Sequence, residues 1–387
     1  MISKRGLTAL LLGVEFMNEW FSNLLAAILP VVKSALGLGY VQVSFLLTVL
    51  EFSDIISDGI FGVLGDIWSR RLLICLGALA AGLGLVLMGL APGYLLLLAG
   101  VALLGFAGGP FIGLSQASLI DAHPGRHDHI MAWWSILGSL GFLATLLMVD
   151  ISYALGINWR PLFITGGILY MLYALLLTRL RISRPRQAYT DETGETPAAL
   201  KQSTWDALKT AALGRALLRW ALIMPLLEMP INGFIPLYFH DVMGLNFAAA
   251  SSLLLIVIIG SLLGKAALPL LLRSMTGMRV LKITVWLGIA SFAAFLVLPG
   301  VLLKCGLLAI FSVVESSWHT LAQAQAYATQ PGKSGVVLSV TSIISPLASF
   351  LPLLVGVIAA QVGLAWGLTA LLIGPLIAGV LLLFARK

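Results

Sequence analysis

The chain has 387 residues, of which 60% are hydrophobic and only 10% are charged. Soluble domains are about one quarter charged, so this composition excludes a soluble globular protein and indicates membrane-spanning segments. The formal net charge is +7, but the basic residues lie in short turns between apolar runs. That pattern is typical of the inner face of a membrane protein, and we expect no nucleic-acid partner.

Long apolar runs follow one another along the chain, and each must satisfy its own backbone hydrogen bonds within the bilayer, so each is expected to be a helix. The sequence therefore predicts an all-α membrane protein with twelve transmembrane helices. The predicted spans are 8–31, 40–64, 72–91, 94–118, 131–155, 160–180, 217–241, 247–272, 279–299, 301–326, 334–359 and 363–385.

Basic residues separate the two sides of the membrane. With both termini inside, the outer turns hold only Lys33, Arg160 and Lys304. All other basic turns and both termini then face the cytoplasm, as the positive-inside rule requires. The inner set comprises Lys4, Arg5, Arg70, Arg71, Arg126, Arg179 through Arg219, Arg273, Arg279, Lys282, Lys333, Arg386 and Lys387. We expect a multi-pass protein of the cell's inner (plasma) membrane.

The stretch 181–216 is the one long polar segment between apolar runs, and its mixed charges and prolines are typical of a linker. Ser203 and Thr204 before a Trp-Asp-Ala-Leu run predict a short amphipathic helix within it. The chain is thus divided into a six-helix bundle at 1–180, a cytoplasmic linker at 181–216, and a second six-helix bundle at 217–387.

The two predicted bundles repeat each other. Gly37-Leu38 matches Gly244-Leu245, and Pro124-Gly125-Arg126 matches Pro331-Gly332-Lys333, both at a spacing of 207 residues. Matches that share one spacing indicate duplicated six-helix halves.

A charged turn follows the second span. Its residues Gly62, Asp66, Arg70 and Arg71 form the pattern G-x-x-x-D-x-x-x-R-R. We interpret Gly62 as a site of close helix approach, Asp66 as a conformational latch that caps a helix or pairs with a base, and the arginines as inner-leaflet anchors. Asp121 and Arg126 form a second such turn after the fourth span.

These motifs resemble the signature of the major facilitator superfamily. The resemblance covers the whole chain, and its first 120 residues look most like the fosmidomycin-resistance type of drug exporters, with Glu15 and Glu19 preceding Pro30. The resemblance implies two pseudo-symmetric six-helix bundles, alternating access, and a central cavity lined by spans 1, 4, 7 and 10. It implies no cofactor, and we expect a monomer that binds a small-molecule substrate, protons and lipid.

Seven acids are predicted at membrane depth, where each costs about 2.5–3.5 kcal/mol unless it finds a partner, a proton or water. They lie on spans 1, 2, 7 and 10: Glu15, Glu19, Glu51, Asp54, Asp58, Glu228 and Glu315. Crowded carboxylates in a low dielectric hold protons near neutral pH, which is the chemistry of proton coupling. Glu315 and His319, one turn apart, are predicted to act as a coupled pair.

Each candidate also has a structural interpretation. Asp58 can pair with Arg70 or Arg71, and His319 can simply bond Glu315. Trp318 is a candidate for stacking on a substrate ring, and Lys265 for snorkelling or pairing with an acid. His123, His127 and His129 with Asp121 and Asp128 allow a metal site, but a solvated inner loop is the interpretation that we favour, and no metal is predicted.

The sequence contains no P-loop and no nucleophile–base constellation, so we predict no enzyme and no ATP-driven pump. The favoured function is proton-coupled export of a drug-like or amphiphilic molecule. The runner-up is a cationic substrate, which the surplus of acids would suit, namely an organic cation, a polyamine or a divalent metal. A lipid-handling membrane protein or a transporter-like receptor is the alternative of another class.

Overall fold

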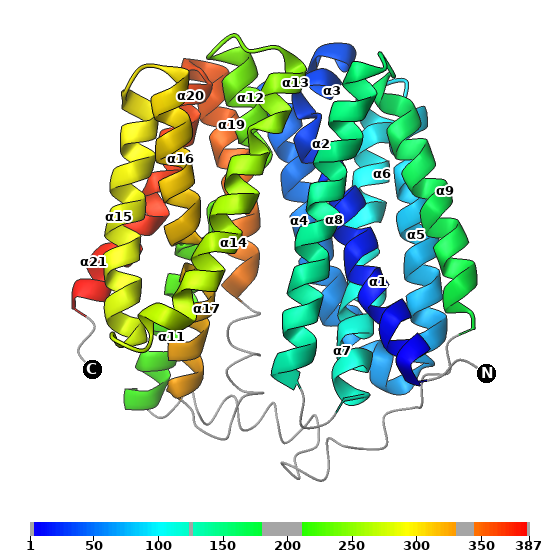
Figure 1. The fold of residues 1–387 in the computed structure, drawn as a ribbon, viewed down its shortest axis with the longest axis horizontal. Coiled ribbons are helices and arrows are strands. Elements are labelled where there is room, and N and C mark those ends of the chain that lie inside the picture. The colour runs from blue at the N-terminus through cyan, green and yellow to red at the C-terminus, as the bar shows by residue number, and fades with distance from the viewer. Residues whose placement is uncertain (1–3, 124–126, 180–210, 330–343, 385–387) are drawn as a thin grey trace. The chain divides into compact units, whose positions relative to one another are not determined.

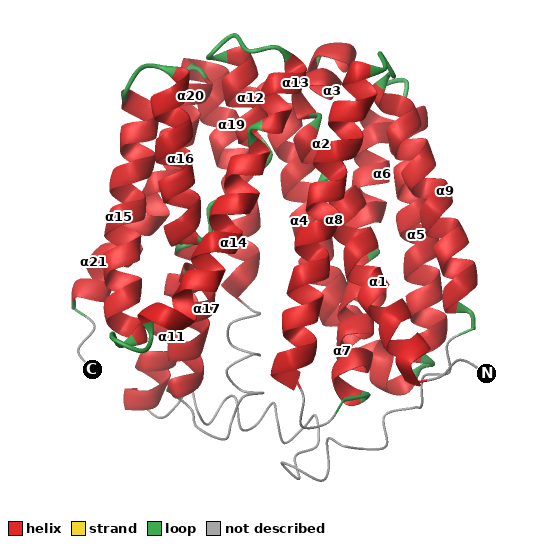
Figure 2. Ribbon diagram, viewed as in Figure 1, coloured by secondary structure: helices red, strands yellow, loops and turns green. Residues whose placement is uncertain are grey.

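The computed structural model describes residues 4–123, 127–179, 211–329 and 344–384, and all regular elements within these ranges are helical (Figure 1, Figure 2). The all-α prediction is therefore confirmed. The helices form two compact units. Unit 1 comprises residues 1–186 and 231–255, and unit 2 comprises 187–230 and 256–387. The predicted linker, 181–216, lies mostly outside the described residues, so the division of the chain at that stretch stays a prediction.

Unit 1 contains the first six predicted spans, the end of the seventh and the start of the eighth. Its helices are α1 (Lys4–Ser22), α2 (Leu24–Ala27), α3 (Leu29–Leu36), α4 (Tyr40–Ile67), α5 (Arg70–Leu90), α6 (Tyr94–Phe106), the π-helical turn η1 (Gly109–Gly113), α7 (Leu114–Asp121), α8 (His127–Ala154), α9 (Trp159–Leu177), α12 (Phe234–Asp241) and α13 (Phe247–Ser252). We name its two ends after the residues at which α4 and α5 begin, the Tyr40 end and the Arg70 end.

Unit 2 contains most of the second repeat. Its helices are α11 (Ala211–Leu226), α14 (Leu254–Leu271, whose first two residues belong to unit 1), α15 (Gly277–Val297), α16 (Val301–Glu315), α17 (Trp318–Ala328), the 3₁₀ turn η2 (Ser345–Phe350), α19 (Leu351–Val362), α20 (Leu364–Thr369), the 3₁₀ turn η3 (Ala370–Leu372) and α21 (Ile373–Leu383).

Within the described residues, nine helices are long and apolar enough to cross a membrane, and they correspond to nine of the twelve predicted spans. The other three predicted spans, 8–31, 40–64 and 217–241, are helical as well. These three carry all of the predicted membrane-depth acids except Glu315. Polar groups thus concentrate in helices that are less suited to face lipid.

The backbone repeats itself as the sequence predicts. Gly37 and Gly244 both have positive φ, 62° and 71°, where each ends the helix before it. Gly156 and Gly363 form a second such pair, with φ of 65° and 96°. Each pair is separated by 207 residues. A glycine without Cβ adopts this left-handed conformation at little cost, so the same helix terminators stand at equivalent places in both halves.

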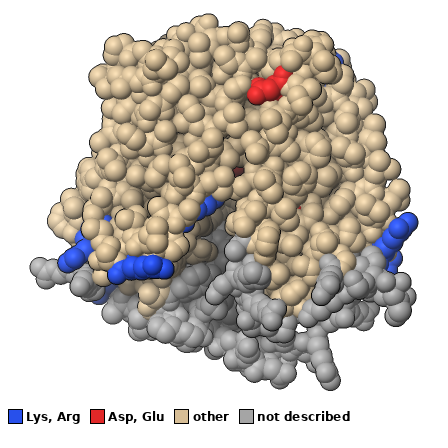
Figure 3. All heavy atoms as spheres, viewed as in Figure 1, with Lys and Arg blue, Asp and Glu red and all other residues tan. Residues whose placement is uncertain are grey.

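Several helices expose apolar stripes of the kind that face lipid. On α5, the exposed leucines Leu72, Leu76, Leu79 and Leu83 recur at helical spacing, with exposed fractions of 42–54%. The α9, α15 and α21 helices carry similar exposed Leu and Ile residues. On the face drawn in Figure 3, uncharged side chains dominate and most of the visible Lys and Arg lie in its lower half. A surface of this kind is stable against acyl chains, not water.

Small residues set how closely the helices of unit 1 approach. The α5 and α9 helices lie side by side (Figure 1), with Gly82 of one against Gly167 of the other. A Cβ on Gly82 would lie 2.8 Å from the carbonyl oxygen of Gly167, closer than real Cβ atoms come. Close backbone approach at small residues is the usual basis of helix packing in membranes, where the solvent is itself apolar.

Candidate functional site

Two carboxylates of the first span pack on a glycine face of α8. A Cβ on Gly138 would lie 2.8 Å from Glu15 Oε1 and 3.3 Å from Glu19 Cγ, and one on Gly141 would lie 3.0 Å from Glu19 Cβ. The Trp134 side chain, one turn before Gly138, hydrogen-bonds Glu15. The glycines therefore make room for the two acids, which share a face of α1 as their spacing predicts.

Glu19 is held at a break in the first span. Its Oε2 accepts a hydrogen bond of 2.8 Å from Asn23 Nδ2, and Asn23 is the residue that separates α1 from α2. The hydroxyl of Thr145 on α8 donates to the carbonyls of Glu19 and Trp20, at 3.2 and 2.5 Å. Asn23 and Thr145 were not among the predicted site residues, although an Asn four residues after a Glu predicted at membrane depth is a visible signal.

In unit 1, the second and fourth spans cross at backbone contact. The Asp54 carboxylate lies against Gly108, where any Cβ would collide with Oδ1. One turn along, a Cβ on Gly109 would lie 2.6 Å from Ser57 Oγ. A Cβ on Gly109 would also meet the backbone of Ser57, and one on Gly108 would displace the Asp54 side chain, so α4 brings its acid stripe directly onto the backbone of the fourth span.

A proline explains why this crossing falls at a π-helical turn. Pro110 has no N–H, so the carbonyl of Phe106, four residues earlier, lacks its usual helical donor. Ser57 Oγ, which is fully buried, donates to that carbonyl at 2.5 Å. The predicted span 94–118 is thus α6, η1 and α7 instead of one regular helix. Single π turns in membrane helices frequently mark functional places.

Unit 2 contains the same crossing with its residues exchanged. Here Gly264 of α14 lies against Ser316, which directly follows α16, and a Cβ on Gly264 would collide with Ser316 Oγ and with the carbonyl of Val313. Ser316 Oγ donates to that carbonyl at 2.8 Å. Gly264 and Ser316 stand 207 residues after Ser57 and Gly109, and Val313 stands 207 after Phe106. Serine and glycine have changed helices, but the hydroxyl meets the equivalent carbonyl.

The carboxylate of this crossing has changed helices too. Glu315 stands 207 residues after Gly108, and Lys265 stands 207 after Asp58. Lys265 and Glu228 are the charged side chains that act electrostatically on Glu315. Each unit therefore has one carboxylate at the crossing, Asp54 from α4 in unit 1 and Glu315 from α16 in unit 2.

Glu228 lies in a second helix break, between α11 and α12, where Pro225 and Pro230 flank it. Its Oε1 is 3.9 Å from Nδ1 of His319, and both side chains are about half exposed, 44% and 56%. The spacing predicted a pair of His319 with Glu315, but the structure places Glu228 within ion-pair distance of His319. Discontinuous helices commonly bear transporter binding sites, because they release polar backbone groups.

The remaining acids of α4 flank Asp54. Glu51 is half-buried one turn before it, and Asp58 is exposed one turn after it, with Oδ1 2.9 Å from where a Gly113 Cβ would lie. Asp58 forms no ion pair with any described residue, so the structure does not show the predicted pairing with Arg70 or Arg71.

The turn between α4 and α5 corrects one prediction. A Cβ on Gly62 would meet nothing within 4 Å, so Gly62 is not a site of close approach. The tight glycine of the motif is Gly65, which packs directly on Leu114 of α7. Arg70 Nε donates to the carbonyl of Gly65 at 3.3 Å, and Arg71 is exposed. The spacing located the turn, but which glycine faces a neighbour depends on the rotation of α4.

Several predictions lie outside the described part of the chain: the side chains of Asp66, Asp121, His127, Asp128 and His129, and the whole of Arg126. His123 is described, and its Nε2 lies 3.1 Å from Thr8 Oγ1 while its Nδ1 lies 3.0 Å from the Leu119 carbonyl. It therefore ties the end of α7 to the start of α1. Among the described residues, no group of three His, Cys, Asp or Glu could hold a metal ion.

Trp318 does not face a cavity in this structure. Its side chain is 1% exposed and meets Phe311 edge to face, with ring centroids 5.9 Å apart. A Cβ on Gly288 would collide with its six-membered ring. The expectation that Trp318 stacks on a substrate is wrong for this conformation, because the residue fills the packed interior of unit 2.

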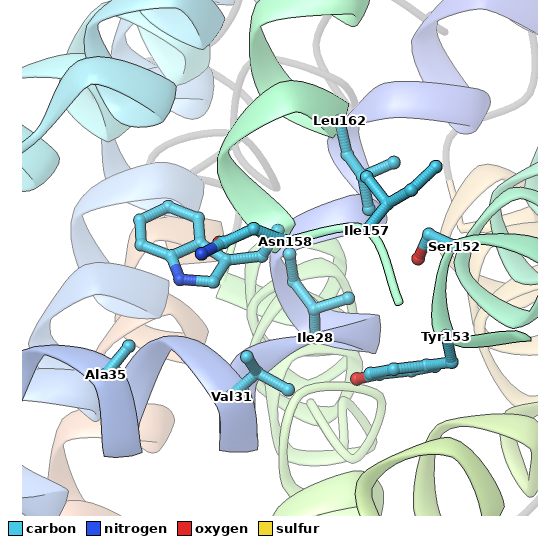
Figure 4. A pocket seen from close by; sticks show the side chains of 9 residues that line it. Ile28, Val31, Ala35, Ser152, Tyr153, Ile157, Asn158 and Leu162 are labelled. Atoms are coloured by element: carbon cyan, nitrogen blue, oxygen red, sulfur yellow. The ribbon is translucent and has the colours of Figure 1, made fainter. Parts of the chain in front are cut away.

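A pocket of about 260 Å³ lies at the Tyr40 end of unit 1, between α2–α3 and the α8–α9 turn (Figure 4). Figure 4 shows Ile28 and Val31 on one wall and Ser152, Tyr153 and Ile157 opposite. A second pocket of about 420 Å³, lined by Trp20 and apolar residues of α8, shares part of this lining. None of the predicted membrane-depth acids lines either pocket.

The Major Facilitator Superfamily model matches residues 11–351. The chain belongs to this superfamily. It is accordingly a multi-pass membrane transporter of the secondary type, which confirms the broad prediction of family and fold. The match identifies the superfamily and no subtype, so the resemblance to the fosmidomycin-resistance exporters stays a prediction.

Solved structures share the fold at low identity. A bacterial homologue of the human lysosomal transporter Spinster, in an inward-facing unoccupied conformation, matches with a TM-score of 0.78 and 15% identity over 98% of this chain and 96% of that one. The nucleoside transporter NupG matches with a TM-score of 0.75 and 16% identity over 98% and 100%. At such identity, the likeness shows the twelve-helix superfamily fold and no substrate.

A curated relative is the Acurin A biosynthesis cluster MFS-type transporter of Aspergillus aculeatus. It is 28% identical over 178 residues, which is 44% of this chain and 31% of that protein. The chain therefore aligns with less than a third of that relative's length.

Proposed function

We propose that the chain exports a small drug-like or amphiphilic molecule in exchange for protons, by alternating access, as its resemblance to the fosmidomycin-resistance exporters suggests. The observation that carries this proposal is the pair of repeat-equivalent crossings, each of which has one of the carboxylates that the sequence predicts at membrane depth. Asp54 forms no ion pair with a described residue, and an isolated carboxylate in hydrocarbon is best held neutral. A proton can neutralise it in one state of the cycle and leave in the other.

The second unit supplies the remaining polar groups. Glu228 and His319 are half exposed at a helix break. Glu228 and the basic side chain of Lys265 both act electrostatically on Glu315. In unit 1, Glu15, Glu19 and Glu51 add further candidates for proton relay. We place the protein in the plasma membrane with both termini in the cytoplasm, since the basic residues of the sequence favour that orientation.

One observation favours a cationic substrate as a second candidate. Asp54 and Asp58 act electrostatically on each other. A cation that displaces a proton from this pair would be attracted by both groups. An organic cation, a polyamine or a divalent metal fits that chemistry.

The test uses the full chain in proteoliposomes with a pH-sensitive dye inside and an imposed pH gradient. The added compounds are an uncharged amphiphile, a lipophilic quaternary ammonium ion, spermidine and Mn²⁺. Proton movement on addition of the uncharged amphiphile supports drug export. Movement with the quaternary ammonium ion, spermidine or Mn²⁺ but not with the uncharged amphiphile supports the cation candidate. If a compound binds the purified protein but none moves protons, proton coupling is overturned and a receptor or lipid-handling role is favoured.

A further inference from the structure

A carboxylate at the Tyr40 end of unit 1 joins two segments that are far apart in the sequence. Asp241 Oδ2, on the last residue of α12, accepts hydrogen bonds of 2.8 Å from Lys33 Nζ and 2.8 Å from Tyr40 Oη. Lys33 and Asp241 are 22% and 15% exposed, and Lys33 Nζ also lies 4.5 Å from the centroid of the Tyr40 ring. None of these residues was a candidate in the sequence analysis.

The repeat shows how Asp241 comes to lie between two basic side chains. Lys33 and Tyr40 have their equivalents 207 residues later in His240 and Phe247, whose rings lie 4.1 Å apart. Each repeat thus stacks a basic side chain on an aromatic one around its left-handed glycine. Asp241 has no acidic counterpart, because the equivalent residue is Ser34. A single carboxylate lies between two repeat-related basic groups.

The second basic group is placed to become a partner after protonation. His240 Nδ1 donates to the carbonyl of Leu245 at 2.8 Å, since a carbonyl can only accept. The other nitrogen, Nε2, lies 3.8 Å from Asp241 Oδ1 and carries a proton only in the charged ring. His240 is adjacent to Asp241 and moves with it, whereas Lys33 and Tyr40 belong to the first repeat.

Two further hydrogen bonds join the same parts of unit 1, namely the segment 231–255 and the helices α2, α3 and α8. We call this contact the seam. Ser251 Oγ donates to the carbonyl of Ala27 at 2.6 Å, and Ser252 Oγ donates to Asp150 Oδ1 at 2.8 Å. Ser251 is 1% exposed. The segment 231–255 of the second repeat is therefore held on α2, α3 and α8 of the first, with the ion pair at its rim.

We propose that Asp241 is the gating residue of the Tyr40 end. When the seam is closed, its carboxylate pairs with Lys33 and accepts a hydrogen bond from Tyr40. When the seam opens, the same carboxylate pairs with protonated His240 instead. This inference rests on the proposed alternating-access function, which requires that the seam separate in each cycle. The Asp241 carboxylate is then paired in both states, since His240 replaces Lys33 when Lys33 departs. The titratable groups that face His240 are Asp241 itself and, across that carboxylate, Lys33 and Tyr40.

The test measures opening without any substrate. Cys75 and Cys305 are replaced by Ala, Ser251 is replaced by Cys, and the purified protein in nanodiscs reacts with a water-soluble maleimide. Asp241→Asn and Lys33→Met should each raise the labelling rate several-fold, because they remove the closing ion pair. Lys33→Arg, which keeps the charge, should label at the parent rate, as should Asp150→Asn, which changes an acid on the same seam that bonds only a hydroxyl.

His240→Asn should change the rate in the opposite direction. Asn keeps a donor for the Leu245 carbonyl but cannot carry charge, so the open state would leave Asp241 unpaired and labelling should fall below the parent rate. Misfolding would raise labelling and cannot mimic this result. Parent rates in Asp241→Asn and Lys33→Met, or a raised rate in His240→Asn, would overturn the gate. Loss of proton movement in vesicles with intact labelling effects would instead count against the proposed function.

Discussion

The crossing of α4 with the fourth span in unit 1 and the crossing of α14 with α16 in unit 2 stand at equivalent places in the repeat, but their residues are exchanged. Serine lies on α4 and glycine on the fourth span in unit 1, and the reverse holds in unit 2. The helices need one small residue and one hydroxyl at this point, and either helix can supply either one. Packing at the crossing is therefore symmetric although the sequence is not.

The charges at the two crossings differ in a second way. Unit 1 places Asp54 and Asp58 on one helix, with no described base paired to either. Unit 2 places Glu315 on α16 and Lys265 at the position equivalent to Asp58. The crossing of unit 2 thus carries a charge compensation that the described residues at the crossing of unit 1 do not supply. We infer that Asp54 depends more on a proton or a cationic substrate for neutrality than Glu315 does.

Adding a methyl group at the glycines of the crossings should have the largest effect on stability. Gly109→Ala and Gly264→Ala each place a Cβ against backbone atoms that cannot move aside, and such overpacking costs about 1–3 kcal/mol. Both variants should lower the apparent melting temperature of the purified protein by several degrees.

The matched control for these variants is Gly62→Ala, on the same α4 helix and with open space around it. It should leave the melting temperature unchanged or raise it slightly, because Ala is the better helix former. Equal losses in all three variants would show that the close contacts at the crossings have no special role.

Removing the hydroxyls should have a smaller effect, and an unequal one. Ser57→Ala leaves the Phe106 carbonyl without the donor that Pro110 cannot provide, and interhelical hydrogen bonds in membranes contribute about 0.6 kcal/mol on average. Ser316→Ala removes a bond to a carbonyl only three residues earlier, so no contact between separate helices is lost. Thermal unfolding of both should rank Ser57→Ala as the less stable, and the reverse order would refute the role assigned to Pro110.

The sequence was sufficient for the broad fold but not for the contacts. Apolar length predicted the spans, and the constant spacing of 207 predicted the repeat that the positive-φ glycines confirm. The sequence did not predict that the fourth span is interrupted between Phe106 and Gly109. Hydrophobic periodicity shows which residues share a face of a helix, but not which backbone they touch. Gly65 was overlooked in favour of Gly62 for the same reason. Aligning the two halves at that spacing would have paired Asp58 with Lys265 and Lys33 with His240.

The most direct measurement of the central claim, one proton-exchanging carboxylate at each crossing, is proton movement in proteoliposomes for Asp54→Asn and Glu315→Gln. We predict that substrate addition moves protons for the unaltered chain and for Asp150→Asn, whose acid lies at the Tyr40 end and away from the crossings. Asp54→Asn should abolish the proton signal, and Glu315→Gln should reduce it at least several-fold, while both variants still bind substrate. Proton movement at the unaltered rate in both variants would contradict the account and assign coupling to Glu15, Glu19, Glu51 or Glu228.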